Sequence, residues 1–392
     1  MRTTSAAATD VADQATEPKI HWDDRFRDAK GREVAPPALA VPTADTHVHL
    51  DMLHHPALAL ARCASHGVDF LVTVVDPTED PAYTYKNLGE WERRARDLLD
   101  DWNRHVPVPR VRVIVGCHPH NASKFTREIE QLLIRCASRP STSGIGEIGL
   151  DYHYDLSPRD LQREAFKRQL ALANEMMLPV ALHLREAHDD GLAILKEEGL
   201  PVAGTLLHCF NLDFATLAGF LDLGCHVAFG GPLTFKKCDE LRDAARRTPL
   251  ERIVTETDAP FMAPVPLRGT ICGPEDVVFT AARLAETFGL EGREAVKMLT
   301  RVYENAHTLF DRDTSTWQDK PKAATLLAAK ATGIPGAVFG AAPDVAAGAG
   351  AEAGAEAGAA TSQGAAPDGA PSPAPDGASS SAPAPSPHDP EE

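Results

Sequence analysis

The sequence predicts an α/β fold, a (β/α)₈ TIM barrel with a mostly irregular N-terminal extension and a disordered C-terminal tail. Short apolar runs rich in β-branched residues recur eight times between residues 44 and 310, and helical patterns separate them. This alternating region also has the length typical of such a barrel, about 250 residues. A doubly wound open sheet shares the same alternation, so strand counting alone does not exclude it.

The elements follow from the apolar periodicity of each segment. Leu161, Ala165 and Phe166 begin a helical repeat, and we expect Ser157 and Pro158 to supply its N-cap and first turn. The predicted strands are 44–49, 70–75, 111–117, 144–149, 180–183, 204–208, 226–229 and 253–256. The predicted helices are 81–105, 125–137, 161–176, 188–198, 213–223, 239–247, 275–288 and 291–310.

Both ends of the chain differ in composition from the barrel region. Residues 1–43 are polar with several prolines, and we interpret them as an extension preceding a barrel at 44–312. Residues 313–392 become rich in Ala, Gly, Pro and Ser, and such segments bury too little apolar surface to offset chain entropy. We therefore expect the tail to be disordered.

Composition and charge exclude several classes of protein. Hydrophobic content of 43% and charged content of 24% are typical of globular proteins. A net charge of −17 argues against coating of duplex nucleic acid by a basic face, although metal ions can still bring phosphate to an acidic enzyme. The seven cysteines form no CxxC pair, and the sequence shows no membrane span or signal peptide. We therefore expect a cytoplasmic protein that does not bind membranes, and the sequence indicates no oligomeric state.

A glycine pattern at 144–149 matches GxGxxG, the fingerprint of dinucleotide-binding folds. That fingerprint needs a preceding strand and a helix that opens within it, and neither is predicted here. We expect these glycines to allow close packing inside a barrel strand.

Residues able to bind metal ions stand at the ends of several predicted strands. Parallel strands of a barrel end at one mouth, where active sites of this fold lie. One histidine at a strand end is usually structural, so the indication comes from the whole set. The set is His47 and His49 on the first strand, Glu147 in the fourth, His183 and His208 ending the fifth and sixth, and Asp258 after the eighth.

The chemistry of this set favours divalent cations. Imidazole and carboxylate ligands suit Zn²⁺, Mn²⁺ or Mg²⁺. The set exceeds what one tetrahedral ion needs, which indicates two ions bridged by a carboxylate. Such a pair activates a shared water and is typical of phosphodiester hydrolysis.

The motifs that carry these residues resemble the TatD family of metal-dependent hydrolases, in the amidohydrolase-like TIM-barrel superfamily. The resemblance runs from about residue 44 to 310 in the family's order. The matching segments are THVHLD at 46–51, GCHPH at 116–120, GEIGLDY at 146–152, PVALHLREA at 179–187, HCF at 208–210, FGGPLTFK at 229–236 and ETDAPF at 256–261.

The resemblance implies a 3′→5′ exodeoxyribonuclease acting on single-stranded or frayed nucleic acid ends. It implies one ion on His47, His49 and Asp258, a second on His183 and His208, and Glu147 bridging them. Asp258 and Glu147 are then the catalytic residues, with Asp258 orienting or deprotonating the attacking water. The implied substrate contacts are His118, Arg185 and Arg268, whereas His120 is expected to be a hydrogen-bonded loop residue.

One departure and two alternatives accompany this interpretation. Cys272 stands where the family usually has Asn, which puts substrate positioning in doubt. The same metal pair can attack a carbonyl, so a metal-dependent deacylase or amide hydrolase, such as a D-aminoacyl-tRNA deacylase, is the alternative function. A non-catalytic barrel scaffold is disfavoured because all six implied ligands are present.

Overall fold

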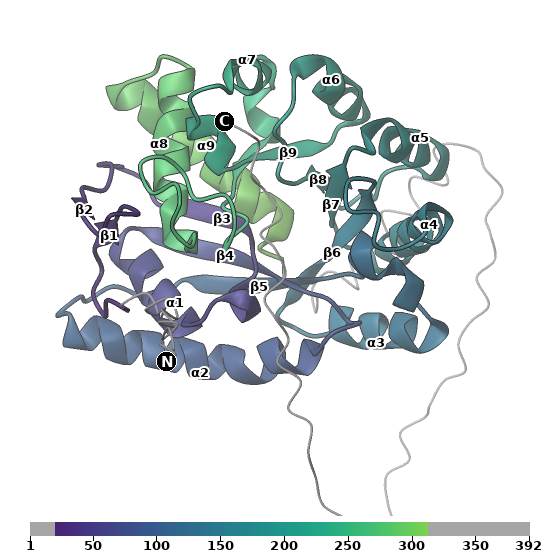
Figure 1. Ribbon diagram of the computed structural model, residues 1–392, viewed down its shortest axis with the longest axis horizontal. Coiled ribbons are helices and arrows are strands. Elements are labelled where there is room, and N and C mark those ends of the chain that lie inside the picture. The colour runs from purple at the N-terminus through teal and green to yellow at the C-terminus, as the bar shows by residue number, and fades with distance from the viewer. Residues whose placement is uncertain (1–19, 313–392) are drawn as a thin grey trace, which may run out of the picture. The chain divides into compact units, whose positions relative to one another are not determined.

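The protein, seen in a computed structural model that describes residues 20–312, contains a parallel sheet of eight strands within that range (Figure 1). Neighbours in the sheet follow chain order. The strands are β3 (Thr43–Val48), β4 (Val68–Val75), β5 (Arg110–Val115), β6 (Thr142–Asp151), β7 (Val180–Arg185), β8 (Thr205–Leu207), β9 (His226–Phe229) and β10 (Ile253–Thr255). The predicted strands are confirmed, with ends that differ by a few residues.

The sheet curls into a nearly closed barrel because β3 meets β10. Their pairing is carried by one parallel bridge, Val48 with Ala259, and by the His49 amide, which donates to the Ala259 carbonyl at 2.8 Å. Threonine hydroxyls replace ladder bonds lower down: Thr46 Oγ1 donates to the Thr255 carbonyl at 3.0 Å, and Thr255 Oγ1 to the Ala44 carbonyl at 2.9 Å. Closure of this seam rules out the open-sheet alternative.

Helices surround the barrel, as Figure 1 shows. They are α1 (Pro56–Ser65), α2 (Pro81–Asp101), α3 (Arg127–Ala137), α4 (Arg159–Met176), α5 (His188–Glu198), α6 (Phe214–Leu223), α7 (Asp239–Arg247), α8 (Val277–Thr287) and α9 (Gly292–Phe310). Short 3₁₀ turns are η1 (Leu50–Met52), η2 (Pro119–Lys124), η3 (Gly231–Thr234), η4 (Leu250–Arg252) and η5 (Pro274–Asp276). Helix α1 is absent from the predicted helices. Within residues 20–312, no helix is long and apolar enough to cross a membrane.

Helix α9 and the glycines of β6 both pack closely against the barrel. Leu309 and Phe310 of α9 join a buried cluster with Phe70, Ile114 and Leu206 of strands β4, β5 and β8. The glycines of the GxGxxG pattern all lie in β6, as expected. At Gly149, with φ of +144°, an added Cβ would stand 2.0 Å from the His183 carbonyl oxygen, so β6 approaches β7 closely beside the site.

The predicted cap of α4 is wrong. Helix α4 begins at Arg159, and the Ser157 hydroxyl makes no capping bond. It donates instead to the His120 carbonyl at 2.8 Å and accepts from the Ser123 amide at 3.0 Å. The serine therefore ties η2 to the loop after β6.

The described part of the N-terminal extension packs against the barrel. It forms a two-stranded antiparallel hairpin, β1 (Phe26–Arg27) with β2 (Glu33–Val34). Phe26 is buried, with its ring 5.0 Å from that of Phe279 and 4.3 Å from that of His66. The predicted domain boundaries at 43/44 and 312/313 stay predictions, and the predicted disorder of 313–392 lies outside the described residues.

Candidate metal centre

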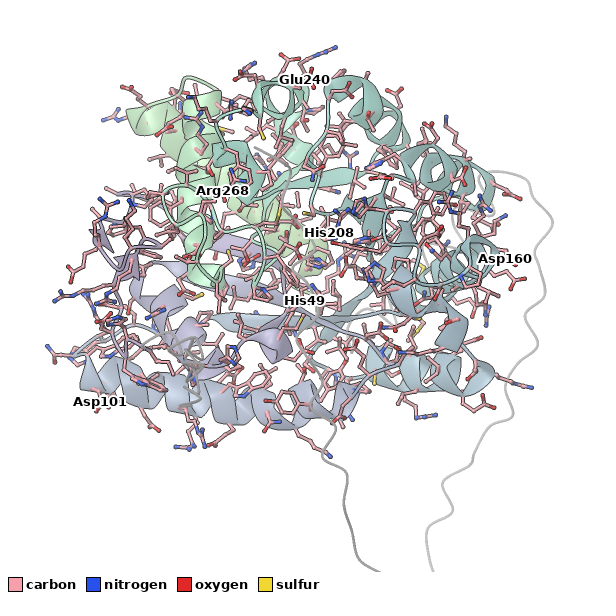
Figure 2. All side chains as sticks on the ribbon, in the orientation of Figure 1. His49, Asp101, Asp160, His208, Glu240 and Arg268 are labelled. Atoms are coloured by element: carbon pink, nitrogen blue, oxygen red, sulfur yellow. The ribbon has the colours of Figure 1, made fainter. Side chains whose placement is uncertain are left out.

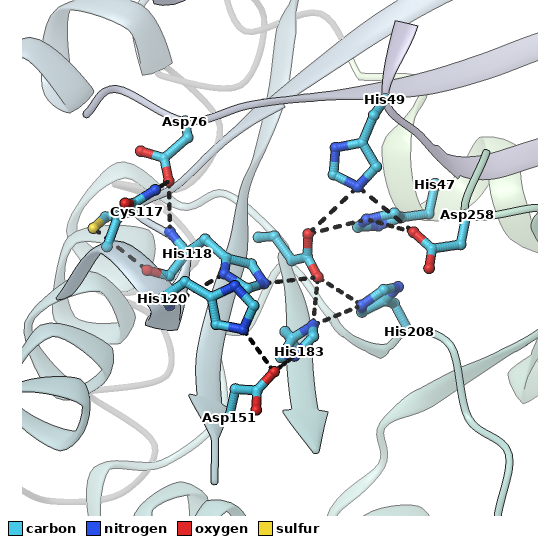
Figure 3. Close-up of polar contacts among 12 residues, drawn as sticks. His47, His49, Asp76, Cys117, His118, His120, Asp151, His183, His208 and Asp258 are labelled. Carbon is cyan, nitrogen blue, oxygen red and sulfur yellow. Dashed lines mark hydrogen bonds and ion pairs between the residues drawn. The ribbon is translucent and has the colours of Figure 1, made fainter. Parts of the chain in front are cut away.

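The six predicted ligands gather at the carboxyl ends of the strands (Figure 3). His47, Glu147, His208 and Asp258 are buried, whereas His49 and His183 are partly exposed at the mouth. In Figure 3, His47, His49 and Asp258 lie on one side, and His183 and His208 on the other. Glu147 has contacts with both groups.

The two oxygens of Glu147 divide the site into two halves. Oε2 lies 3.3 Å from His47 Nε2 and 3.7 Å from His49 Nε2. Oε1 lies 2.7 Å from both His183 Nδ1 and His208 Nε2. Asp258 Oδ1 completes the first half, 3.5 Å from His49 Nε2 and 4.0 Å from His47 Nε2. This division matches the two ligand sets that the family resemblance implies.

The backbone at the strand ends aims these side chains inward. Asp258 has φ of +60°, an uncommon left-handed conformation for a residue with a side chain. The buried Asp45 carboxylate accepts from the amides of His47 and Thr257, at 3.1 and 3.0 Å, and from the Thr257 hydroxyl. Since one carboxylate bonds both segments, His47 and Asp258 are held side by side.

The environment shifts the pKa values of these groups strongly. Burial lowers the pKa of His47 to about 4, and the neighbouring His208 lowers it further. Burial also acts to raise the pKa of Asp258, but the hydrogen bond from His49 and the nearby histidines outweigh it and bring the value to about 2. Burial opposes protonation of His49 and His183, yet their carboxylate partners raise both pKa values to about 9. Asp258 is therefore ionised at neutral pH.

The residues present fit divalent metal ions. Both ring nitrogens of the fully buried His47 lack a hydrogen bond among residues 20–312, and its Nε2 is the atom that faces the oxygens of Glu147 and Asp258. A buried polar atom without a partner is costly, and a cation between His47 Nε2 and these oxygens would satisfy that nitrogen. Three groups around Glu147 and Asp258 place their ligand atoms within 4.8 Å of one another: His47/Glu147/His208, His47/His49/Asp258 and His118/Glu147/His183.

The predicted substrate contacts occupy different positions around this centre. His118 lies beside the bridging carboxylate, with Nε2 3.7 Å from Glu147 Oε1. Arg185 ends β7 and stacks over the Tyr154 ring, 4.7 Å from its centroid. Arg268 lies on the loop after β10, over the ring of Phe235 at 4.5 Å (Figure 2). Their roles toward substrate stay predictions.

Cys272, the departure from the family pattern, does not line the mouth. Its side chain is fully buried and packs in the cluster that contains Phe26, Leu267 and Val277. Its Sγ lies 3.6 Å from the Gly273 carbonyl oxygen. The thiol is therefore part of the core.

Two buried carboxylates behind the second half were missed at the sequence level. Asp151 Oδ2 lies 3.1 Å from His183 Nε2. Glu256, fully buried, accepts from the Cys209 amide and has Oε2 3.8 Å from His208 Nδ1. Both stand in the quoted motifs GEIGLDY and ETDAPF, but neither motif alone says which histidine the carboxylate faces.

Comparison with known proteins identifies the family of the barrel. Residues 44–311 match the family described as TatD related DNase. The uncharacterised metal-dependent hydrolase YcfH of Escherichia coli K12 is 35% identical over 280 residues, covering 70% of this chain and 97% of that protein. The 3′-5′ ssDNA/RNA exonuclease TatD of Pantoea vagans is 38% identical over 202 residues, covering 50% of this chain and 76% of its own.

A solved structure supports the same assignment. The crystal structure of YjjV, a TatD homologue from Escherichia coli K12, has a TM-score of 0.60 at 26% identity and covers 69% of this chain and 98% of its own. Family match and fold thus agree over the whole barrel. The chain belongs to the TatD family of metal-dependent hydrolases.

Proposed function

We propose that this protein is a two-metal phosphodiesterase, a 3′→5′ exodeoxyribonuclease that trims single-stranded or frayed nucleic acid ends. The observation that carries the proposal is the Glu147 carboxylate, with one oxygen in each of two histidine groups. That arrangement is what a bridge between two Mg²⁺, Mn²⁺ or Zn²⁺ ions requires. The name of the Pantoea vagans relative supports the substrate class.

The metal ligands follow the two halves of the site. His47, His49 and Asp258 would hold one ion, His183 and His208 the other, and Glu147 both. Ions bound there would lower the pKa of a water and neutralise charge on the scissile phosphate. The catalytic residues are then Asp258 and Glu147.

The surrounding residues bind and orient. Asp258 is ionised and faces the shared centre, so it can orient the attacking water and accept its proton. The planar guanidinium groups of Arg185 and Arg268 suit phosphate oxygens, and each is braced by an aromatic ring. His118, beside Glu147, contributes a further polar contact.

The acidic chain favours a single-stranded end over a duplex. A net charge of −17 repels an extended phosphate backbone, so contact is restricted to the terminal nucleotides that reach the ions. All seven cysteines are free thiols, which supports action in the reducing cytoplasm.

The test uses the full chain, loaded in turn with Mg²⁺, Mn²⁺ and Zn²⁺. End-labelled single-stranded DNA, the same sequence as RNA, and D-aminoacyl-tRNA are incubated with it. We expect stepwise release of mononucleotides from the 3′ end of DNA, abolished by EDTA and by Asp258→Asn. Asp160→Asn, which changes an exposed carboxylate on α4, is the matched control and should leave the rate unchanged.

Two further results bear on the proposal: the kinetics of an arginine variant, and the choice of substrate, which separates the proposal from its alternative. Arg268→Ala should raise KM more than it lowers kcat if its contact is equally strong in the ground and transition states. If the metal-loaded enzyme leaves labelled DNA intact but releases the amino acid from tRNA, the phosphodiesterase proposal fails and the deacylase takes its place.

A further inference from the structure

Asp151, the last residue of β6, is a fully buried carboxylate beside the second half of the metal centre. Its Oδ1 accepts from the amides of His153 and Tyr154 at 3.0 and 2.9 Å. Its Oδ2 contacts Nε2 of His120 at 2.8 Å and Nε2 of His183 at 3.1 Å, as Figure 3 shows. An ionised carboxylate has about four acceptor sites, and all four are used.

These contacts determine which nitrogen of His183 is free to bind metal. Oδ2 can only accept, so Nε2 of His183 carries the proton that points at Asp151. Nδ1 is then the nitrogen with a lone pair when the ring is neutral, and it is the atom that lies 2.7 Å from Glu147 Oε1. A histidine that donates its second N–H to a carboxylate is the usual form of a metal ligand.

The second branch of Asp151 determines the state of His118. Asp151 holds the His120 ring, and Ser157 Oγ donates to the His120 carbonyl at 2.8 Å. The His120 amide then donates to Nδ1 of His118 at 3.2 Å. Because Nδ1 of His118 accepts, its proton must sit on Nε2, the atom that faces Glu147 Oε1 at 3.7 Å.

His118 and His183 therefore differ in the group that each directs at the centre, although the ligand atoms of both lie within 4.8 Å of a Glu147 oxygen. When its ring is neutral, as metal binding requires, His183 offers a lone pair at Nδ1, whereas His118 offers an N–H at Nε2. A nitrogen that carries a proton cannot bind a cation, but it can donate to an oxygen of a bound phosphate.

We propose that Asp151 is a positioning residue that fixes His183 as a metal ligand and, through His120, fixes His118 as a hydrogen-bond donor to the substrate. This inference rests on the proposed two-metal function and adds to it two residues, Asp151 and His120, that hold the site without meeting the reacting atoms.

The variant Asp151→Asn tests the first branch. An asparagine keeps the shape but offers one acceptor oxygen and one NH₂ group. If the oxygen takes the Oδ2 position, the NH₂ group faces the two backbone amides, and donor meets donor. If the side chain flips, the NH₂ group faces the N–H groups of both imidazoles instead. We expect calorimetric titration of the metal-free protein with Mn²⁺ to show one equivalent bound about 10- to 100-fold more weakly, the range for lost partners of ligand histidines.

Asp155→Asn is the matched control, an exposed carboxylate on the same loop whose side chain pairs with Arg159. It should bind both equivalents as the wild type does. Equal binding of both equivalents by Asp151→Asn would overturn the inference.

The second branch is tested without a mutation, so a folding defect cannot obscure it. Nitrogen-15 NMR of the zinc-loaded wild type should show His118 protonated on Nε2 and not bound through that atom, and His183 protonated on Nε2 and bound through Nδ1. A zinc-bound Nε2 on His118 would refute the assignment. Neither measurement uses nucleic acid, so a protein that passes both yet cleaves no DNA would contradict only the proposed substrate.

Discussion

Replacing Glu147 with Gln is the sharpest perturbation of the proposed metal pair. The amide keeps the size of the side chain but removes its charge, and its nitrogen cannot bind a cation. If that nitrogen takes the Oε1 position it faces His183 and His208, and if it takes the Oε2 position it faces His47 and His49. In either orientation one half of the site loses a ligand.

The expected loss of metal affinity can be bounded from two sides. Losing a partner that merely supports a ligand histidine costs about 10- to 100-fold, and Glu147 is a proposed ligand itself, so this is a lower bound. Two unit charges about 4 Å apart interact by about 4 kcal/mol at an effective dielectric constant of about 20. We therefore expect one equivalent to bind roughly 100- to 1,000-fold more weakly, about 3–4 kcal/mol.

Metal analysis after dialysis measures the outcome directly. Wild type and Glu164→Gln, an exposed glutamate on α4, should each retain two ions per chain. Glu147→Gln should retain one or fewer under the same conditions. Two ions per chain in Glu147→Gln would show that the carboxylate does not bridge.

Four further predictions concern folding and the chain ends. Gly149→Ala should destabilise the protein by more than about 4 kcal/mol in urea denaturation, because the new Cβ would lie 2.0 Å from the His183 carbonyl oxygen. The control Gly89→Ala on α2, where a Cβ would have nothing within 4 Å, should be neutral or stabilising. Equal stability of the two variants would contradict this prediction. Phe26→Ala should cost about 3–5 kcal/mol because the ring is buried against α8, and unchanged stability would mean that the extension adds nothing to the core. Burial lowers the pKa of His226 to about 4, below the value of about 6.5 in the unfolded chain. The folded protein should therefore lose up to about 3 kcal/mol of stability as the pH falls from about 6.5 toward 4. Melting curves of His226→Gln should lack this loss, and parallel pH profiles of variant and wild type would refute the prediction. Deleting residues 341–392 should leave kcat nearly unchanged, and a folded deletion variant that loses most turnover would refute that expectation.

The sequence by itself determined the barrel and the identity of the proposed ligands. Each strand could be predicted from its own residues, because the pattern of apolar residues within a segment indicates which of its faces are buried. Ligand residues at strand ends could be recognised because parallel strands bring their carboxyl ends to one mouth whatever the exact packing. His47, Glu147 and Asp258 therefore needed no contact information to be grouped.

Tertiary structure decided everything that depends on which atoms meet. Ser157 has the sequence context of a helix cap, but its hydroxyl donates to the His120 carbonyl on η2. Cys272 follows the predicted substrate contact Arg268 closely in the sequence, yet its side chain is buried in the core. In the sequence Asp151 is one of many acidic residues. The pairing of β6 with β7 places its carboxylate against His183. Hydrogen bonds and side-chain directions act over about 3 Å, a distance that periodicity along the chain does not specify.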